Sequence, residues 1–479
     1  MRRFKSLVYV ESFLSFGTEI VMNRNKYIFE KVTLSTLKAM ISVFFSACVS
    51  WCWINFFNSD VPMPYYRLGH YFMFAVVLVA YICIAKIYGA FNIGTSSVTN
   101  LAFSQIITIF IWQIICYLIF CLVSFKLVGI KYFIMMFVIF SAFASLWAIV
   151  SDNIYFTLHK PKKTIVVYDN KESYISLKDV RNMKRRFNVQ KTLKVANVTL
   201  EELFSQIMEV DAVFLCGVTS EYRNEVVKFC IANGKVAYVK PKISDTIIRG
   251  SRTVQILNIP VYRCARAGNS FLYLVVKRVI DIIFSLFFII LTSPIMLITA
   301  AAIKLNDGGP VFYKQARYTK DKKVFNVIKF RSMRVDAEKD GVARLASEND
   351  DRITPVGKVI RKLRLDELPQ LFNILSGSMS VVGPRPERPE IFEQYEKTMP
   401  EFALRLQVKA GLTGYAQVYG KYNTPPYDKV QMDLTYIANQ SIFQDIKLML
   451  LTFKIIFVSD STEGIKEGQV TADRNSEKS

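Results

Sequence analysis

Histidine is almost absent from this sequence, which contains only His70 and His159. A histidine-rich metal site and a histidine-based catalytic triad are therefore not expected. The eight cysteines include no pair in the CxxC spacing, and most lie in apolar stretches. We therefore expect small buried thiols in a reducing compartment, not a disulfide framework.

Negative charge is also scarce, because 39 acidic residues face 61 lysines and arginines, which gives a net charge of +22. Hydrophobic residues make up 52% and aromatic residues 14% of the 479-residue chain. Disordered chains are poor in such residues, so disorder over most of the length is excluded. At roughly 150 residues per domain, the length predicts about three domains.

Charged residues are missing from long stretches of the first third of the chain, such as residues 87–125. A helix needs about 20 apolar residues to cross the hydrocarbon core of a membrane. The sequence therefore predicts a four-helix transmembrane domain over residues 36–150. Its spans are predicted near residues 36–57, 71–90, 103–125 and 131–150.

Basic residues flank this predicted domain. The segment that precedes it, residues 1–35, is rich in Lys and Arg, and Lys160, Lys162 and Lys163 follow it. The positive-inside rule places both flanks in the cytoplasm, which four crossings allow. We therefore expect everything after the fourth span to lie on the cytoplasmic side.

Short apolar runs alternate with stretches of helical period over residues 160–262. The runs, typical of buried parallel strands, are residues 163–169, 210–217 and 235–240. This alternation predicts a Rossmann-like α/β domain. The residues after the first run read YDNKESY and contain no glycine, whereas a dinucleotide site needs a glycine-rich turn there. A scaffold or dimerisation domain is therefore favoured over dinucleotide binding.

A fifth apolar stretch, residues 282–303, is long enough to span a membrane, and hydropathy alone favours a further crossing. Ser293 and Pro294 lie in its middle. Proline removes a backbone donor and kinks or breaks a helix, so this position predicts an interruption.

The flanks of this stretch are both basic. Lys277 and Arg278 precede it, and residues 304–334 are strongly basic, as expected for a cytoplasmic surface that faces anionic lipids. A fifth crossing would place that basic surface on the outer side of the membrane. We therefore expect a re-entrant helix over residues 278–304, which enters and leaves the membrane on the same side.

Polar patterning is densest after residue 304, around the adjacent carboxylates Asp366 and Glu367. Other candidate site residues, which bracket this pair, are Lys329, Arg331, Arg385, Arg405, Lys409 and Asp433. Arginines and lysines that converge on two carboxylates suit a phosphate ester with a divalent cation. An aspartate can also attack phosphorus as a nucleophile. The alternative is that the pair is the acidic first turn of a helix, beside a solvated or lipid-facing basic surface.

The order of motifs adds a resemblance. From about residue 272 to 458 the chain resembles the bacterial sugar transferase family, whose members are monotopic phosphoglycosyl transferases that act on polyprenyl phosphate. The motifs, in order, are Lys277-Arg278 with Asp281, Ser293-Pro294, GPVFYKQAR, KFRSM, LDELPQLFN, SVVGPRPE and GLTGYAQV.

The four spans and the α/β domain resemble the large subgroup of undecaprenyl-phosphate glucose- or galactose-phosphate transferases. The chain departs from the family pattern at Lys409-Ala410-Gly411, where many relatives have a basic residue followed by Pro-Gly. The glycine-free turn in the α/β domain is a second departure.

The resemblance implies a fold that combines membrane α-helices with α/β structure, and a catalytic domain over residues 272–458. It implies that Asp366 and Glu367 are catalytic and that the Ser-Pro break shapes the re-entrant helix. Asp366 would attack the β-phosphorus of UDP-glucose or UDP-galactose and release UMP. Undecaprenyl phosphate would then accept the sugar phosphate.

The resemblance also implies roles for the remaining candidates. Glu367 would hold Mg²⁺. Phosphate contacts would come from Lys329, Arg385 and Lys409, with Arg331 and Arg405 as further candidates and Asp433 supporting the site or the nucleotide.

The implied role is the first committed step of capsule, exopolysaccharide or O-antigen assembly, at the cytoplasmic face of the bacterial inner membrane. Two other classes remain open: a conventional membrane glycosyltransferase that releases UDP, and a non-catalytic scaffold or regulator. The basic residues lie beside membrane segments, so membrane lipids and not nucleic acid are the expected partners. We also expect a homodimer and a mobile tail over residues 460–479.

Overall fold

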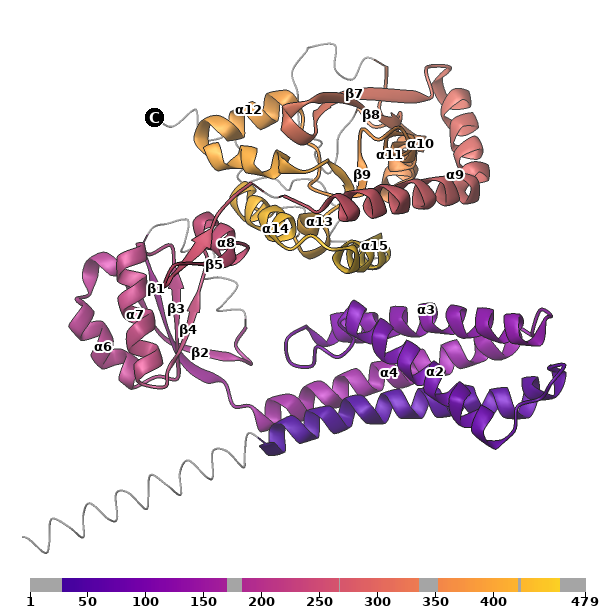
Figure 1. Cartoon of the computed structure of the whole chain (residues 1–479), viewed down its shortest axis with the longest axis horizontal. Coiled ribbons are helices and arrows are strands. Elements are labelled where there is room, and N and C mark those ends of the chain that lie inside the picture. Colours follow the sequence, from indigo (N-terminus) through magenta and orange to yellow (C-terminus); the bar gives the residue numbers. More distant parts are fainter. Residues whose placement is uncertain (1–27, 170–182, 267, 336–351, 421–423, 457–479) are drawn as a thin grey trace, which may run out of the picture. The chain divides into compact units, whose positions relative to one another are not determined.

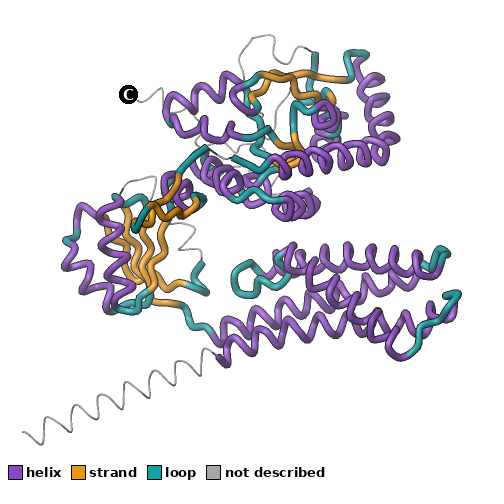
Figure 2. Tube along the Cα trace, in the orientation of Figure 1, coloured by secondary structure: helices purple, strands orange, loops and turns teal. Residues whose placement is uncertain are grey.

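The structure, a computed structural model, describes the chain except for residues 1–27, 170–182, 267, 336–351, 421–423 and 457–479 (Figures 1 and 2). It divides into two compact units, Met1–Lys240 and Pro241–Ser479. Most of the predicted N-terminal segment, most of the glycine-free turn and the predicted tail lie outside the described residues.

The first unit contains four long helices, and each is long and apolar enough to cross a membrane. They are Ile28–Phe57, α2 (Arg67–Tyr88), α3 (Val98–Ser124) and α4 (Lys131–Leu158). The first ends in a π-helical turn, η1 (Trp53–Phe57), and the short helix η2 (Asn58–Asp60) follows. Each of the four predicted spans overlaps one of these helices.

Aromatic rings and internal hydrogen bonds hold these helices together. Phe45 stacks on Phe140 with ring centroids 4.5 Å apart. The Trp112 indole N–H donates to the carbonyl of Val77 at 2.9 Å, which satisfies a polar group inside an apolar bundle. The chain is therefore a membrane protein with a packed helical domain.

A parallel sheet with the order β2-β1-β3-β4 completes the first unit. Its elements are β1 (Lys162–Tyr168), β2 (Phe187–Lys194), η3 (Val195–Asn197), α6 (Leu200–Met208), β3 (Ala212–Cys216), α7 (Ser220–Ala232) and β4 (Val236–Val239). The three predicted strands correspond to β1, β3 and β4. Alternating strands and helices make this a mixed α/β region.

The second unit begins before the end of the predicted Rossmann-like range, residues 160–262. It contains α8 (Ile243–Arg249) and the antiparallel hairpin of β5 (Arg252–Ile256) and β6 (Ile259–Arg263). Ile243 of α8 is buried in the main apolar core of this unit, which explains why α8 belongs there.

The rest of the second unit consists of one long helix, short helices and two small sheets. In chain order these are α9 (Phe271–Asp307), β7 (Phe312–Tyr318), η4 (Lys320–Lys322), β8 (Val324–Phe330), α10 (Pro355–Lys362), η5 (Leu365–Glu367), α11 (Gln370–Ser376), β9 (Ser380–Val382), α12 (Pro389–Thr398), η6 (Pro400–Gln407), β10 (Gly411–Thr413), α13 (Tyr415–Tyr419), α14 (Pro426–Ala438) and α15 (Ile442–Ile456). Strands β7 and β8 pair antiparallel, and β9 and β10 pair parallel.

Helix α9 contains Pro294, and Figure 1 shows that its ribbon changes direction along its length. Proline has no N–H to donate to the carbonyl four residues earlier, that of Ile290. The Ser293 hydroxyl donates to that carbonyl instead, at 2.8 Å. The Ser-Pro pair therefore keeps the backbone satisfied inside an apolar helix, which is the fifth helix long and apolar enough to cross a membrane among the described residues.

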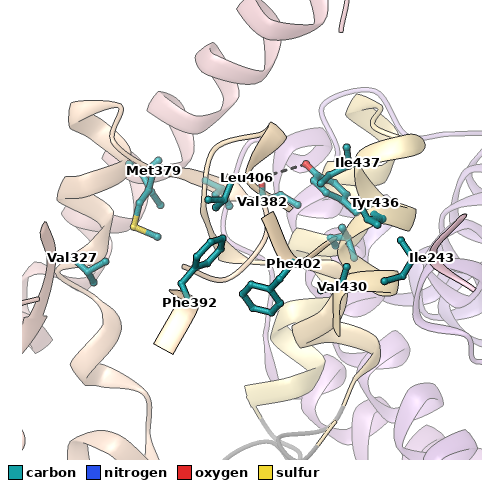
Figure 3. Close-up of a cluster of buried hydrophobic side chains, with 14 of the residues drawn as sticks. Ile243, Val327, Met379, Val382, Phe392, Phe402, Leu406, Val430, Tyr436 and Ile437 are labelled. Carbon is teal, nitrogen blue, oxygen red and sulfur yellow. Dashed lines mark hydrogen bonds between the residues drawn. The ribbon is translucent and has the colours of Figure 1, made fainter. Parts of the chain in front are cut away.

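Figure 3 shows the core of the second unit, where side chains from β8, β9, α12, η6 and α14 meet. Phe392 and Phe402 lie at its centre with ring centroids 5.0 Å apart. The Tyr436 hydroxyl donates to the carbonyl of Val382 in β9 at 3.3 Å. This core fixes β9 and, with it, the segment that leads to Arg385.

Candidate active site

Asp366 and Glu367 lie in η5, the short turn between α10 and α11. Leu365 and Leu368 on either side pack against a buried cluster that includes Met296 of α9. Apolar anchors at both ends therefore hold the two carboxylates in place. The pair does precede a helix, as the simpler interpretation of the sequence expected, but its surroundings are unusual for a helix start.

Three cationic side chains surround Glu367. The Arg385 guanidinium donates to its carboxylate at 2.8 Å, the Lys329 ammonium lies 3.5 Å away and Arg364 lies 3.7 Å away. The Glu367 side chain is only 14% exposed. These residues come from three segments of the chain, so tertiary structure creates the cluster.

The two carboxyl groups have pKa values shifted in opposite directions. Burial alone would raise the pKa of Glu367, but the charges of Arg385, Lys329 and Arg364 outweigh it and hold the pKa far below its ordinary value. Burial raises the pKa of Asp366, and the negative charge of Glu367 raises it further. One carboxylate is therefore a fixed anion, and the other is the more basic of the pair.

Asp366 differs from Glu367 in its contacts as well. In the described part of the chain no hydrogen bond or ion pair reaches its carboxylate, although Lys329, Arg361 and Arg385 act on it electrostatically. A half-buried carboxylate with a raised pKa and no described partner can attack an electrophile or bind a cation.

Arg405 and Asp433 form a buried ion pair that contacts the backbone of Arg385. Arg405 is 2% exposed and Asp433 is 1% exposed, and the guanidinium contacts the carboxylate at 2.6 Å. Arg405 also donates to the backbone carbonyl of Arg385 at 3.2 Å. These two predicted binding residues therefore support the backbone that carries Arg385.

Two predicted phosphate ligands lie elsewhere. Arg331 is buried and pairs with Asp307 at the end of α9, not with the dyad. Lys409 donates to the carbonyl of Gly377 at 2.8 Å, at the end of α11 opposite to the dyad. The structure thus brings Lys329 and Arg385 to the carboxylates, but neither Arg331 nor Lys409.

The charged residues of α9 tie the site to this helix. The Lys277 ammonium pairs with Asp445 of α15 at 2.8 Å. Arg278 donates to the carbonyls that end α11, including that of Ile374 at 2.6 Å. Asp281 accepts from the backbone N–H of Val381 in β9 at 2.9 Å. One helix therefore positions α11, β9 and α15.

Comparison with known proteins agrees with the motif order. Residues 272–459 match the sequence profile described as bacterial sugar transferase. A protein of Bacillus subtilis described as the uncharacterized sugar transferase EpsL is 39% identical over 202 residues, which are 42% of this chain and 96% of the relative. The chain belongs to the bacterial sugar transferase family.

Relatives with described activities match about half of this sugar transferase. The UDP-glucose:undecaprenyl-phosphate glucose-1-phosphate transferase of Klebsiella pneumoniae is 40% identical over 244 residues, 50% of this chain and 52% of the relative. A UDP-N-acetylgalactosamine-undecaprenyl-phosphate N-acetylgalactosaminephosphotransferase of Aeromonas hydrophila is 37% identical over 242 residues, 50% of this chain and 56% of the relative. The matches thus span about half the length of these two relatives.

Only one carboxylate of the dyad of this sugar transferase is available to bind a divalent cation. Among the described residues there is no group of three or more His, Cys, Asp and Glu side chains that could hold a metal ion alone. Mg²⁺ takes one or two carboxylates and completes its shell with substrate phosphates and water, so two acidic side chains suffice. Asp366 pairs with no residue that the structure describes and can contribute, whereas Glu367 is already paired with three cations.

Sequence reasoning missed three residues that build the site of this sugar transferase. Arg364 precedes the dyad with a left-handed backbone, φ 53°, and contacts Glu367. Arg317 donates to the carbonyl of Pro386 at 3.0 Å and so holds the Arg385 segment. Asn373 bridges α11 to β8 by accepting from Ile328 N–H at 2.9 Å. Arg317 and Asn373 both lie within the family motifs GPVFYKQAR and LDELPQLFN, so membership of these motifs could have identified them as site residues.

Proposed function

We propose that this chain transfers a hexose-1-phosphate from a UDP-sugar to undecaprenyl phosphate and releases UMP. The observation that carries the proposal is the more basic Asp366 carboxylate, which pairs with no described residue, beside an anionic Glu367 that is surrounded by three cations. The activities of the Klebsiella and Aeromonas relatives support this reaction class.

The first step is an attack by an Asp366 carboxylate oxygen on the β-phosphorus of the UDP-sugar. A new P–O bond forms, the bond from the β-phosphorus to the bridging oxygen breaks, and UMP leaves with that oxygen. The sugar-1-phosphate then remains on Asp366 as an acyl phosphate. Arg385, whose side chain is 42% exposed, would contact the donor's phosphates.

In the second step a phosphate oxygen of undecaprenyl phosphate attacks the same phosphorus. The bond to Asp366 breaks, the carboxylate is regenerated and a diphosphate-linked sugar forms. Mg²⁺, held at the dyad together with the donor's phosphates, would neutralise phosphate charge. Helix α9 would enter and leave the membrane from the cytoplasmic side and place the dyad at the lipid boundary.

The nucleotide product tests this proposal. Full-length protein in membranes is incubated with Mg²⁺, undecaprenyl phosphate and a panel of UDP-sugars that contains glucose, galactose and N-acetylgalactosamine. We expect UMP with one of these sugars and no UMP from D366N, which should insert into the membrane like the wild type. UDP as the product would instead indicate a conventional glycosyltransferase. No nucleotide from any sugar would favour the scaffold.

A further inference from the structure

A cavity of about 280 Å³ lies among α8, α13, α14 and α15 of the second unit. None of the residues that line it belongs to the dyad or to the cations around Glu367. Its walls include Arg249, Tyr415, Tyr419, Asn439 and Lys447. No step of the proposed reaction uses this cavity.

The cavity is lined by two cations, Arg249 and Lys447, and neither forms an ion pair with a described residue. The acids nearest to them in sequence are engaged elsewhere, since Asp245 accepts from the N–H of Lys242 at 2.7 Å and Asp445 pairs with Lys277. No acidic side chain belongs to the described lining. An anion that entered would therefore meet two positive charges without a competing carboxylate.

Two tyrosines add hydrogen-bond donors to the same cavity. The rings of Tyr415 and Tyr419 lie 4.5 Å apart between centroids, and no hydrogen bond to another described residue uses either hydroxyl. Burial raises the pKa of Tyr415, although the nearby charges of Lys447 and Arg249 oppose it. Its phenol therefore stays protonated and can donate to a phosphate oxygen.

The helix that carries Lys447 also carries exposed apolar side chains. Phe443 and Ile446 of α15 are 70% and 42% exposed. Phe453, farther along α15, packs against Phe288 of the apolar helix α9 with ring centroids 6.1 Å apart. Exposed apolar residues beside a lysine and tyrosines are typical of the interface between membrane and water.

We propose that this cavity binds the phosphate group of an anionic membrane lipid, with Arg249 and Lys447 as its charge partners and the two tyrosines as donors. The ligand that these side chains would recognise is a phosphate ester. The exposed apolar residues of α15 favour a lipid over a soluble ester. The site is separate from the dyad and would seat the catalytic unit on anionic bilayers. It does not depend on the proposed reaction.

Native mass spectrometry of the full chain tests this site. Protein is released from detergent micelles doped with 1-palmitoyl-2-oleoyl-phosphatidylglycerol (POPG), and retained lipid is counted. We expect the wild type to retain one POPG more than R249Q/K447Q, with apparent affinity about tenfold or more weaker in the variant, because charge-assisted bonds are lost. The control K323Q/K397Q removes equal charge at exposed lysines outside the cavity and should retain lipid like the wild type.

Other outcomes separate the alternatives. Equal POPG retention by the wild type and R249Q/K447Q would overturn the site. Displacement of the retained lipid by millimolar inorganic phosphate or UMP, or equal retention of uncharged phosphatidylcholine, would overturn the assignment to an anionic lipid. If the double variant does not fold, R249Q alone decides the matter, because Arg249 is exposed.

The variant D366N distinguishes this proposal from the proposed function. It should lose UMP release while it retains POPG like the wild type. Loss of the lipid from D366N would show that the cavity and the dyad form one site and would contradict a separate lipid site.

Discussion

Asp366 and Glu367 are neighbours in one turn, but their pKa values are shifted in opposite directions. Glu367 is held as an anion by Arg385, Lys329 and Arg364, whereas no cation in the described part of the chain pairs with Asp366, whose pKa is raised. Environments that push the pKa values of a pair apart separate their chemical roles. This difference supports Asp366 as the group that reacts and Glu367 as the group that organises the cations.

The raised pKa of Asp366 predicts how activity depends on pH. Protonation removes the nucleophile, so UMP release should fall as the pH drops through a value above the ordinary 3.8 of an aspartate. Arg361 lowers this pKa, so R361Q should move the acid limb of kcat/KM to higher pH. The exposed neighbour Lys362 is not among the main charges that shift the pKa of Asp366, so K362Q is the control. An acid limb that stays unchanged in R361Q would argue against Asp366 as the titrating group.

The buried pair of Arg405 and Asp433 predicts a loss of stability. In D433N the buried Arg405 charge loses its close partner and keeps only the longer contact with Glu387, at 3.7 Å. Breaking a buried pair costs about 3–5 kcal/mol of unfolding free energy, and the remaining contact places the expected loss toward the lower end. We expect a clearly lower Tm for full-length D433N in detergent, measured by intrinsic fluorescence. The apolar double variant R405M/D433L should recover part of the loss.

A different result for D433N would support the role that the sequence predicted for Asp433, at the site or the nucleotide. If D433N kept the wild-type Tm and lost only UMP release, Asp433 would act on the substrate directly and not as a structural support.

At the scale of elements, α9 organises the catalytic unit. Lys277, Arg278 and Asp281 lie within its second and third turns and bind α15, α11 and β9. The Ser293 hydroxyl replaces the donor that Pro294 lacks. A bend in this helix is therefore compatible with satisfied backbone groups, as an apolar environment requires.

Labelling of α9 from the two sides of the membrane distinguishes a re-entrant helix from a crossing. Leu272 and Leu305 lie near its two ends and are 71% and 87% exposed. In a background that lacks the exposed Cys83 and Cys264, L272C and L305C should both react with an impermeant maleimide only from the cytoplasmic side. Reaction of the two positions from opposite sides would mean that α9 crosses the membrane.

The elements that the sequence predicted best are those with a long or uniform apolar pattern. The four N-terminal helices and strands β1, β3 and β4 fall into this class. Strand β2 was not predicted because it reads FNVQKTLK and forms one edge of the sheet, where polar side chains are tolerated. Local pattern carries no signal for such an edge strand.

Pairing of distant residues was harder to predict than their presence. The motifs located Lys329, Arg385, Asp366 and Glu367, which the fold brings together. Arg331 had the same charge and follows Lys329 by two residues, just after the end of β8, but it pairs with Asp307 of α9 instead. Charge and spacing could not reveal this, because tertiary packing decides which cations meet which carboxylates.

At the scale of the whole molecule, the chain consists of two units with separate cores. The family profile, residues 272–459, falls within the second unit. The Bacillus relative is matched over 96% of its own length by 202 residues of this chain. We therefore assign the proposed chemistry to the second unit. The first unit supplies four of the five described helices that are long and apolar enough to cross a membrane, and the parallel sheet.

The central claim is that Asp366 carries the sugar phosphate between the two steps. The most direct measurement is mass spectrometry of full-length protein after incubation with Mg²⁺ and the preferred UDP-sugar, without undecaprenyl phosphate. We predict release of about one UMP per active site and a hexose-phosphate adduct on the peptide that contains Asp366, with neither in D366N. Adding undecaprenyl phosphate should discharge the adduct. Turnover that needs both substrates together, with no adduct and no UMP before the acceptor is added, would contradict the account.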